Sequence, residues 1–120
     1  PVKGRFRNHV EYVVWATNGP HSSPQEVYPS AILRHSSPSG TRRIHLTEKP
    51  VGLVEELLTL TPAGGVVLDP FVGSGTTGVA ALNTGREFIG VEMSAHYIDV
   101  AAQRLAATNV QDALDFGGIT

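Results

Sequence analysis

The chain contains no cysteine among its 120 residues. Disulfide bonds and thiolate metal sites are therefore excluded, and the composition is consistent with a protein of the reducing cytoplasm. No apolar run approaches the roughly 20 residues of a membrane-spanning helix, and no stretch has the pattern of a signal peptide. With 41% hydrophobic and 17% charged residues, the sequence predicts a soluble, globular, cytoplasmic protein of one domain.

The histidines and serines also lack a recognisable catalytic or metal-binding pattern. His9, His21, His35 and His45 are separated by 12, 14 and 10 residues, whereas the ligands of zinc sites come in short pairs. Most of the serines lie in one stretch, without the strained turn and paired acid of a nucleophilic enzyme. We therefore predict neither a metal site nor a nucleophilic catalytic residue.

Charge is divided unevenly between the two halves of the chain. Residues 1–49 carry seven Lys or Arg against three Glu, a net charge of +4, and residues 50–120 carry two Arg against eight acids, a net charge of −6. A basic half suits a polyanion such as nucleic acid, although an ordinary solvated surface explains so mild an excess equally well. Under the first interpretation, Arg34, Arg42 and Arg43 are the candidates for contacts with DNA phosphates.

The N-terminal third predicts one strand and one long loop. Residues 9–17 are rich in β-branched and aromatic types, which favours a strand and places Tyr12 and Trp15 in a core or on a sheet rather than against a base. Residues 18–44 contain four prolines and six serines with almost no periodicity, which is typical of a long loop. Loops of this length are usually functional or disordered.

Helices and strands are predicted to alternate in the rest of the chain. Pro50 suits the first position of a helix, because its fixed φ fits there and its missing N–H would be unpaired anyway. Gly85 is expected to end the second helix, and Ser94 is expected to cap the third. The expected elements are a helix from Pro50, a strand at 66–69, a helix around 79–82, a strand at 88–91 and a helix from Ser94. This order implies an α/β fold in which parallel strands are joined by a right-handed crossover.

The third helix and the C-terminus carry weaker signals. The apolar face expected on that helix consists of Ile98, Ala101, Ala102 and Leu105, at the spacing of a helical stripe. Residues 109–120 show no clear pattern and are predicted to form a tail.

A glycine-rich turn between the first strand and the second helix is the most informative feature. Asp69 follows the apolar run Val66-Val67-Leu68 and is followed by Pro70-Phe71-Val72-Gly73-Ser74-Gly75-Thr76-Thr77-Gly78. Glycine at 73 and 75 permits backbone angles closed to other residues and lets the main chain approach a ligand. The following helix directs free N–H groups toward the same place. The pattern predicts a nucleotide-binding turn.

Two classes of cofactor are compatible with this turn. Gly73-x-Gly75-x-x-Gly78 matches the dinucleotide fingerprint, and Glu92 follows Gly73 by 19 residues, near the spacing of the acid that binds a ribose hydroxyl. A fragment of a dinucleotide-binding oxidoreductase is therefore one interpretation. Asp69 opposes it, because a carboxylate repels a pyrophosphate and attracts a cation, such as the ammonium group of an amino acid.

The motif Asp-Pro-Phe-x-Gly-Ser-Gly-Thr-Thr at 69–77 resembles the S-adenosylmethionine-binding motif of DNA amino-methyltransferases, which methylate adenine N6 or cytosine N4. The resemblance extends to residues 45–50, His-Leu-Thr-Glu-Lys-Pro, where the family usually has proline in place of Leu46. It also includes Gly90-Val91-Glu92, and then Tyr97 and Arg104-Leu105. In the permuted beta class the cofactor segments follow the catalytic and target-recognition segments, and here the loop at 18–44 likewise precedes the cofactor motif. The resemblance implies a partial Rossmann-like methyltransferase fold with a mixed, mainly parallel sheet flanked by helices.

The resemblance also implies roles for individual residues. Asp69 and the turn from Phe71 to Thr77 would hold the methionine portion of S-adenosylmethionine and surround the sulfonium. Glu92 would accept the ribose hydroxyls, and Met93 would lie beside the adenine. Thr47 and Lys49 would reach the methionine carboxylate. The full set of cofactor-binding candidates is Thr47, Lys49, Asp69, Phe71, Gly73, Ser74, Gly75, Thr76, Thr77, Glu92 and Met93.

Four regions follow from the same resemblance. Residues 1–17 would form a terminal strand region of the methyltransferase sheet, and residues 18–44 a flexible loop that is a candidate target-recognition segment. Residues 45–108 would bind S-adenosylmethionine, and residues 109–120 would form the tail.

The chain also departs from the family in a second respect, because it lacks the catalytic turn. These enzymes use an Asp/Asn/Ser-Pro-Pro-aromatic turn to accept hydrogens from the target amine and to stack the flipped base, and here no two of the 8 prolines are adjacent. We therefore expect the cofactor-binding C-terminal portion of a DNA methyltransferase of the restriction–modification kind, inactive alone. Its partners would be double-stranded DNA and an N-terminal segment of the same protein that carries the turn. A non-catalytic cofactor-binding remnant or subunit is the remaining interpretation.

Overall fold

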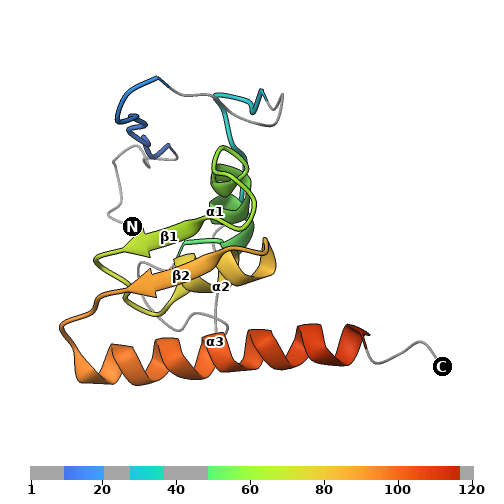
Figure 1. The fold of residues 1–120 in the computed structure, drawn as a ribbon. Coiled ribbons are helices and arrows are strands. Elements are labelled where there is room, and N and C mark those ends of the chain that lie inside the picture. Colours follow the sequence, from blue (N-terminus) through green and yellow to red (C-terminus); the bar gives the residue numbers. More distant parts are fainter. Residues whose placement is uncertain (1–9, 21–27, 37–48, 117–120) are drawn as a thin grey trace.

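Helices and strands alternate along the second half of the chain in the computed structural model, which describes residues 10–20, 28–36 and 49–116 (Figure 1). The elements are α1 (Val51–Leu58), β1 (Val66–Asp69), α2 (Thr76–Asn83), β2 (Glu87–Gly90) and α3 (Ala95–Phe116). β1 and β2 pair in parallel, with Val66 opposite Glu87 and Asp69 opposite Gly90. α2 connects the two strands. The predicted α/β class with parallel strands is confirmed.

α2 packs against one face of the sheet and carries most of the small core. Ala80 and Ala81 are fully buried, and Leu58 of α1 completes the cluster at 7% exposure. Alanine side chains let α1 and the sheet approach α2 closely, because they occupy little volume. The partly buried residues around this cluster are Val51, Val54, Val67 and Phe88.

The opposite face of the sheet is uncovered in the part of the chain that the structure describes. Val66, Leu68 and Ile89 expose 58%, 64% and 55% of their surface. They alternate along the strands with Val67 and Phe88, which face α2, as the pleat of a strand requires. Parallel sheets are ordinarily covered on both faces. The described elements therefore supply one of the two layers that such a sheet packs against.

The strand predicted for residues 9–17 is wrong for the described part, residues 10–17, which form no strand. Tyr12 and Trp15 expose 92% and 60% of their surface, so neither packs in a core or on a sheet. β-branched and aromatic residues favour a strand only where a neighbouring strand offers hydrogen bonds and packing, and the described sheet consists of β1 and β2. His9 lies outside the described residues. The assignment of residues 1–17 to the sheet of a complete methyltransferase stays a prediction.

α3 differs from the predicted helix in its packing face and in its length. Ala101 is buried and Leu105 is partly buried, as predicted, but Ile98 and Ala102 are exposed. Among the described elements α3 contacts only α2. A narrow apolar stripe on α3 is therefore enough to cover this contact. The predicted tail is helical as far as Phe116, because residues 109–116 contain no glycine or proline to end the helix. Neither α3 nor any other helix of the described residues is long and apolar enough to cross a membrane.

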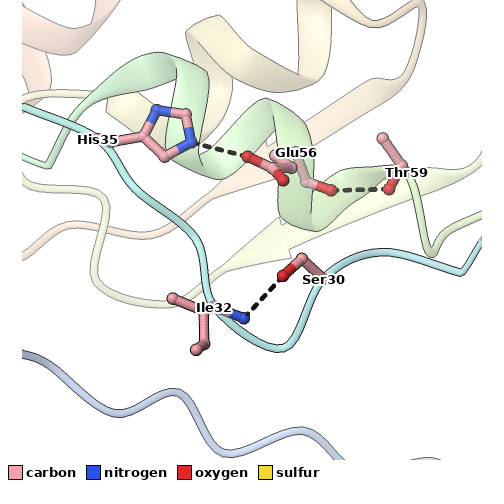
Figure 2. Close-up of polar contacts among 5 residues, drawn as sticks. All are labelled: Ser30, Ile32, His35, Glu56 and Thr59. Carbon is pink, nitrogen blue, oxygen red and sulfur yellow. Dashed lines mark hydrogen bonds and ion pairs between the residues drawn. The ribbon is translucent and has the colours of Figure 1, made fainter.

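Residues 28–36 form no helix or strand, and they reach α1 through one polar contact. His35 Nε2 lies 2.8 Å from Glu56 Oε2, and the Ile32 N–H donates to Ser30 Oγ at 3.1 Å (Figure 2). Residues 18–20 also lack a helix or strand. Residues 21–27 and 37–44 lie outside the described part, and the assignment of residues 18–44 to a flexible loop with a role in target recognition stays a prediction.

A buried arginine joins the two loops that precede the strands. Arg86 is 8% exposed, and its guanidinium donates to Thr61 Oγ1 and the Thr61 carbonyl, both at 2.7 Å, and to the Thr84 carbonyl at 2.8 Å. Thr61 precedes β1 and Thr84 precedes β2. These bonds therefore hold the amino ends of both strands, at the opposite end of the sheet from the glycine turn.

Arg86→Met is expected to lower the free energy of unfolding by about 2–4 kcal/mol. Methionine retains much of the apolar stem, but it leaves oxygens of the partly buried Thr61 and Thr84 without a charged donor, and such bonds contribute about 1.5–3 kcal/mol. Urea denaturation followed by circular dichroism measures the loss. Gln103→Met, at an exposed position of α3, is the control and should change stability by less than about 0.5 kcal/mol. A loss below about 1 kcal/mol for Arg86→Met would show that the three bonds contribute little.

Candidate functional site

The chain leaves the sheet at Asp69 and turns over residues 70–75 before α2 begins. Asp69 Oδ1 accepts a hydrogen bond from the Phe71 N–H at 2.9 Å, a side-chain turn typical of aspartate. The Val91 N–H donates to the Asp69 carbonyl at 2.9 Å, and the Val72 N–H donates to the Val91 carbonyl at 3.1 Å. The carboxyl ends of β1 and β2 are thereby held side by side, which is where open α/β sheets bind their ligands.

Gly73 and Gly75 both adopt left-handed backbone angles, with φ of +52° and +86°. A Cβ on Gly75 would lie 3.0 Å from Ala101 Cβ and 3.1 Å from Ala101 Cα, whereas a Cβ on Gly73 would meet nothing within 4 Å. Glycine at 75 therefore permits both the backbone angle and the close approach of α3. Gly73 borders open space, where the atoms of a ligand can reach the backbone.

Glu92 contacts the turn directly. Its Oε2 accepts from the Gly73 N–H at 2.9 Å, and its Oε1 accepts from the Ser94 N–H at 2.8 Å. The carboxylate that follows Gly73 by 19 residues in the sequence thus binds the backbone of the first glycine of the turn. A carboxylate offers about four lone-pair sites, so these two bonds do not exhaust its capacity.

Arg104 contacts the turn from α3. Ser74, between the two glycines, is 5% exposed. Its carbonyl oxygen and its Oγ accept from Arg104 Nη1 at 2.7 and 3.1 Å. Sequence reasoning assigned no role to Arg104. The available signal was its position three residues after the buried Ala101, on the same side of a helix.

The remaining candidates on the turn and after β2 differ in exposure. Thr76 is buried and Thr77 partly buried, at the start of α2, where the first N–H groups have no partner within the helix. Phe71 and Met93 expose 87% and 100% of their surface. The residues that the structure brings together at the carboxyl ends of β1 and β2 are Asp69, Phe71, Gly73, Ser74, Gly75, Thr76, Thr77, Glu92 and Met93.

Of the remaining candidates, the structure describes Lys49 and Arg34. Lys49 is exposed and forms an ion pair with Glu11, while Thr47 lies outside the described residues. Arg34 is exposed and lines an open cavity with Glu11, and Arg42 and Arg43 are not described. Their roles in cofactor and DNA binding stay predictions.

Comparison with known proteins decides the family. A family model described as DNA methylase matches residues 2–103. The chain belongs to this DNA methylase family. The methylase chain is 40% identical over 114 residues to YubD of Escherichia coli (strain K12), a methylase by name, a match that covers 93% of this chain and 47% of YubD.

Two further relatives agree with this family. The type II methyltransferase M2.DpnII of Streptococcus pneumoniae is 50% identical over 66 residues, which are 54% of this chain and 25% of that protein. The crystal structure of the M1.HpyAVI–SAM complex matches with a TM-score of 0.53 and 42% identity, over 59% of this chain and 36% of that one. The resemblance predicted from the glycine turn is confirmed. The methylase chain spans less than half of the length of each of these relatives.

Proposed function

We propose that the methylase chain binds S-adenosylmethionine at its glycine turn, as the cofactor-binding part of an enzyme that methylates adenine N6 or cytosine N4 in double-stranded DNA. One observation carries the proposal: the carboxylates of Asp69 and Glu92 lie at the ends of neighbouring strands, beside a turn that borders open space at Gly73. S-adenosylmethionine offers an ammonium group and a ribose diol to two such acids. A dinucleotide would bring a pyrophosphate toward Asp69. The relative M1.HpyAVI, solved as a SAM complex, supports the choice.

The donors and acceptors present fit this cofactor. Asp69 would bind the ammonium group, and Glu92 would accept hydrogen bonds from the ribose hydroxyls. Exposed apolar surface on Met93 suits the adenine, and that on Phe71 suits the methionine portion near the sulfonium. Backbone N–H groups at the start of α2 suit polar atoms of the methionine portion. When bound, the cofactor supplies an activated methyl group, and the part of this chain is to bind and orient it.

The catalytic turn is proposed to come from an N-terminal segment of the same protein. No two prolines are adjacent in the 120 residues, and more than half of YubD has no counterpart here. The sheet face of Val66, Leu68 and Ile89, left open by the described elements, would give such a segment a surface to pack against. Contacts from Arg34, Arg42 and Arg43 to phosphates would add to DNA binding, and the cytoplasm is where we expect the protein to act.

Calorimetry with S-adenosylhomocysteine and with NAD tests the proposed cofactor. We expect S-adenosylhomocysteine to bind, and Asp69→Asn to weaken it roughly tenfold, because one charge-assisted hydrogen bond contributes about 1.5–3 kcal/mol. Asparagine keeps an oxygen that can accept the Phe71 N–H bond, so this variant isolates the charge. Glu92→Gln should also weaken binding roughly tenfold or more.

Glu87→Gln is the matched control for both variants. Glu87 is an exposed acid at the opposite end of β2 from Glu92, so its replacement should leave the dissociation constant unchanged. Tighter binding of NAD than of S-adenosylhomocysteine would favour the oxidoreductase interpretation. Unchanged affinity in both the Asp69 and the Glu92 variant would mean that the cofactor binds elsewhere.

A further inference from the structure

We propose that Arg104 is a positioning residue for the glycine turn. Through Ser74, it fixes the orientation of the peptide group between Ser74 and Gly75, and with it the backbone that would face the cofactor. Arg104 donates to the turn and has no role in the chemistry itself. The consequence for cofactor binding rests on the proposed function, whereas the ordering of the turn does not depend on any ligand.

The first support is the pair of hydrogen bonds that Arg104 donates to Ser74, a buried residue. Ser74 is 5% exposed, and Arg104 Nη1 lies 2.7 Å from its carbonyl oxygen and 3.1 Å from its Oγ. A charged donor makes a stronger bond than a neutral one. A buried carbonyl that loses its donor has no water to replace it. The Ser74 carbonyl therefore depends on Arg104 for its orientation.

The second support is the way α3 is seated against the turn. Ala101 packs so close to Gly75 that an added Cβ would lie 3.1 Å from Ala101 Cα. Arg104 follows Ala101 by three residues and so lies on the same side of α3. The close contact at Gly75 fixes the position of the helix, and the Arg104 side chain then bonds the preceding residue. The two contacts act on adjacent residues of one turn.

The third support is the freedom that the turn would otherwise have. The peptide between Ser74 and Gly75 is a rigid trans plane, in which the carbonyl and the N–H point in opposite directions. The Gly75 N–H donates to the Val72 carbonyl at 2.9 Å, so Arg104 and Val72 hold the two ends of one plane. Because glycine tolerates many backbone angles, this plane can rotate easily once one end is released. Arg104 removes the freedom that Gly75 introduces.

The experiment compares two substitutions of Arg104 in the 120-residue chain. Arg104→Met keeps an apolar stem and removes every donor, and Arg104→Lys keeps one charged donor that can reach a Ser74 oxygen. Gln103→Met, at the neighbouring exposed position, is the control. Two quantities are measured: hydrogen exchange at the Gly75 N–H and at the Val91 N–H, which donates to the Asp69 carbonyl, and the dissociation constant of S-adenosylhomocysteine.

We expect Arg104→Met to speed exchange at Gly75 roughly tenfold, to leave Val91 unchanged, and to weaken S-adenosylhomocysteine binding roughly tenfold. Arg104→Lys should recover part of both losses, and Gln103→Met should match the unmodified chain. Equal acceleration at Gly75 and Val91 would overturn the proposal, because Arg104 would then stabilise the whole domain and not the turn in particular. No acceleration at Gly75 would also overturn it, because Arg104 would then not hold the turn. If the unmodified chain fails to bind S-adenosylhomocysteine, the proposed function fails, and the exchange at Gly75 still decides the role of Arg104.

Discussion

Gly75→Val is expected to reduce S-adenosylhomocysteine binding at least 100-fold and to lower the free energy of unfolding by about 2–5 kcal/mol. A residue with a Cβ strains the left-handed angle by about 1–2 kcal/mol, and an overpacked contact adds about 1–3 kcal/mol. Both terms apply, since φ is +86° and the new Cβ would press on Ala101. The valine side chain would push α3 away from the turn. Calorimetry and urea denaturation measure the two losses.

Gly73→Ala is the matched control, because it separates backbone strain from steric contact. Gly73 also has a positive φ, +52°, but a Cβ there meets nothing within 4 Å. We expect it to cost only the strain, about 1–2 kcal/mol of stability. If Gly73→Ala destabilises the chain as much as Gly75→Val, contact with α3 is not the reason for glycine at 75. Full binding by Gly75→Val would contradict the assignment of the site.

The 120-residue chain alone is expected to transfer no methyl group to DNA. A filled cofactor site presents the sulfonium, but without a Pro-Pro-aromatic turn nothing orients the target amine toward it. Such positioning accounts for about 7–11 kcal/mol of a reaction barrier, which corresponds to roughly 10⁵-fold or more in rate. Tritium transfer from labelled S-adenosylmethionine to mixed-sequence DNA measures the activity, which should not exceed that of a blank without protein.

The same assay, with the chain joined to the part of YubD that has no counterpart here, supplies the comparison. If the joined protein transfers the methyl group and Glu92→Gln abolishes that transfer, the result would support catalysis by one segment and cofactor binding by the other. Transfer by the isolated chain would show that catalytic residues lie within it, and residues 18–44 would be the first place to search. Weak DNA binding by the isolated chain is compatible with either result, because phosphate contacts need no specific base.

The elements from α1 to α3 were predictable because their signals are local. The glycine turn and Gly85 each act on the backbone within a few residues, and the structure follows them. Pro50 was predicted as the first helical residue, but it lies one residue before α1 with an extended backbone (ψ 131°). The strand predicted at residues 9–17 failed because a strand requires a partner, and the sequence of one segment cannot supply it. The helical stretch up to Phe116 was missed because residues 109–116 show no apolar periodicity that would predict a helix. The helix continues there because no glycine or proline ends it.

The candidate site was predictable only where chemistry follows from motif and spacing. Asp69, the two glycines and Glu92 were identified in this way, and the structure brings them together. Arg104 belonged to the resemblance, but its partner could not be predicted, because that partner is a backbone carbonyl 30 residues earlier, and every residue has a carbonyl. Which one a side chain binds is decided by the packing of α3 against Gly75, a contact between distant parts of the chain.

The separation of Ser74 and Arg104 along the chain determines when the turn can fold during synthesis. Ser74 and Arg104 are separated by 30 residues, so a ribosome that adds about 5–20 residues per second needs roughly 2–6 seconds between them. During this interval the nascent turn has its glycines but neither Ala101 nor Arg104 to hold it. With Arg104 holding the turn as proposed, the turn takes its final form only once α3 has been synthesised, and the candidate cofactor site is among the last parts of the domain to form.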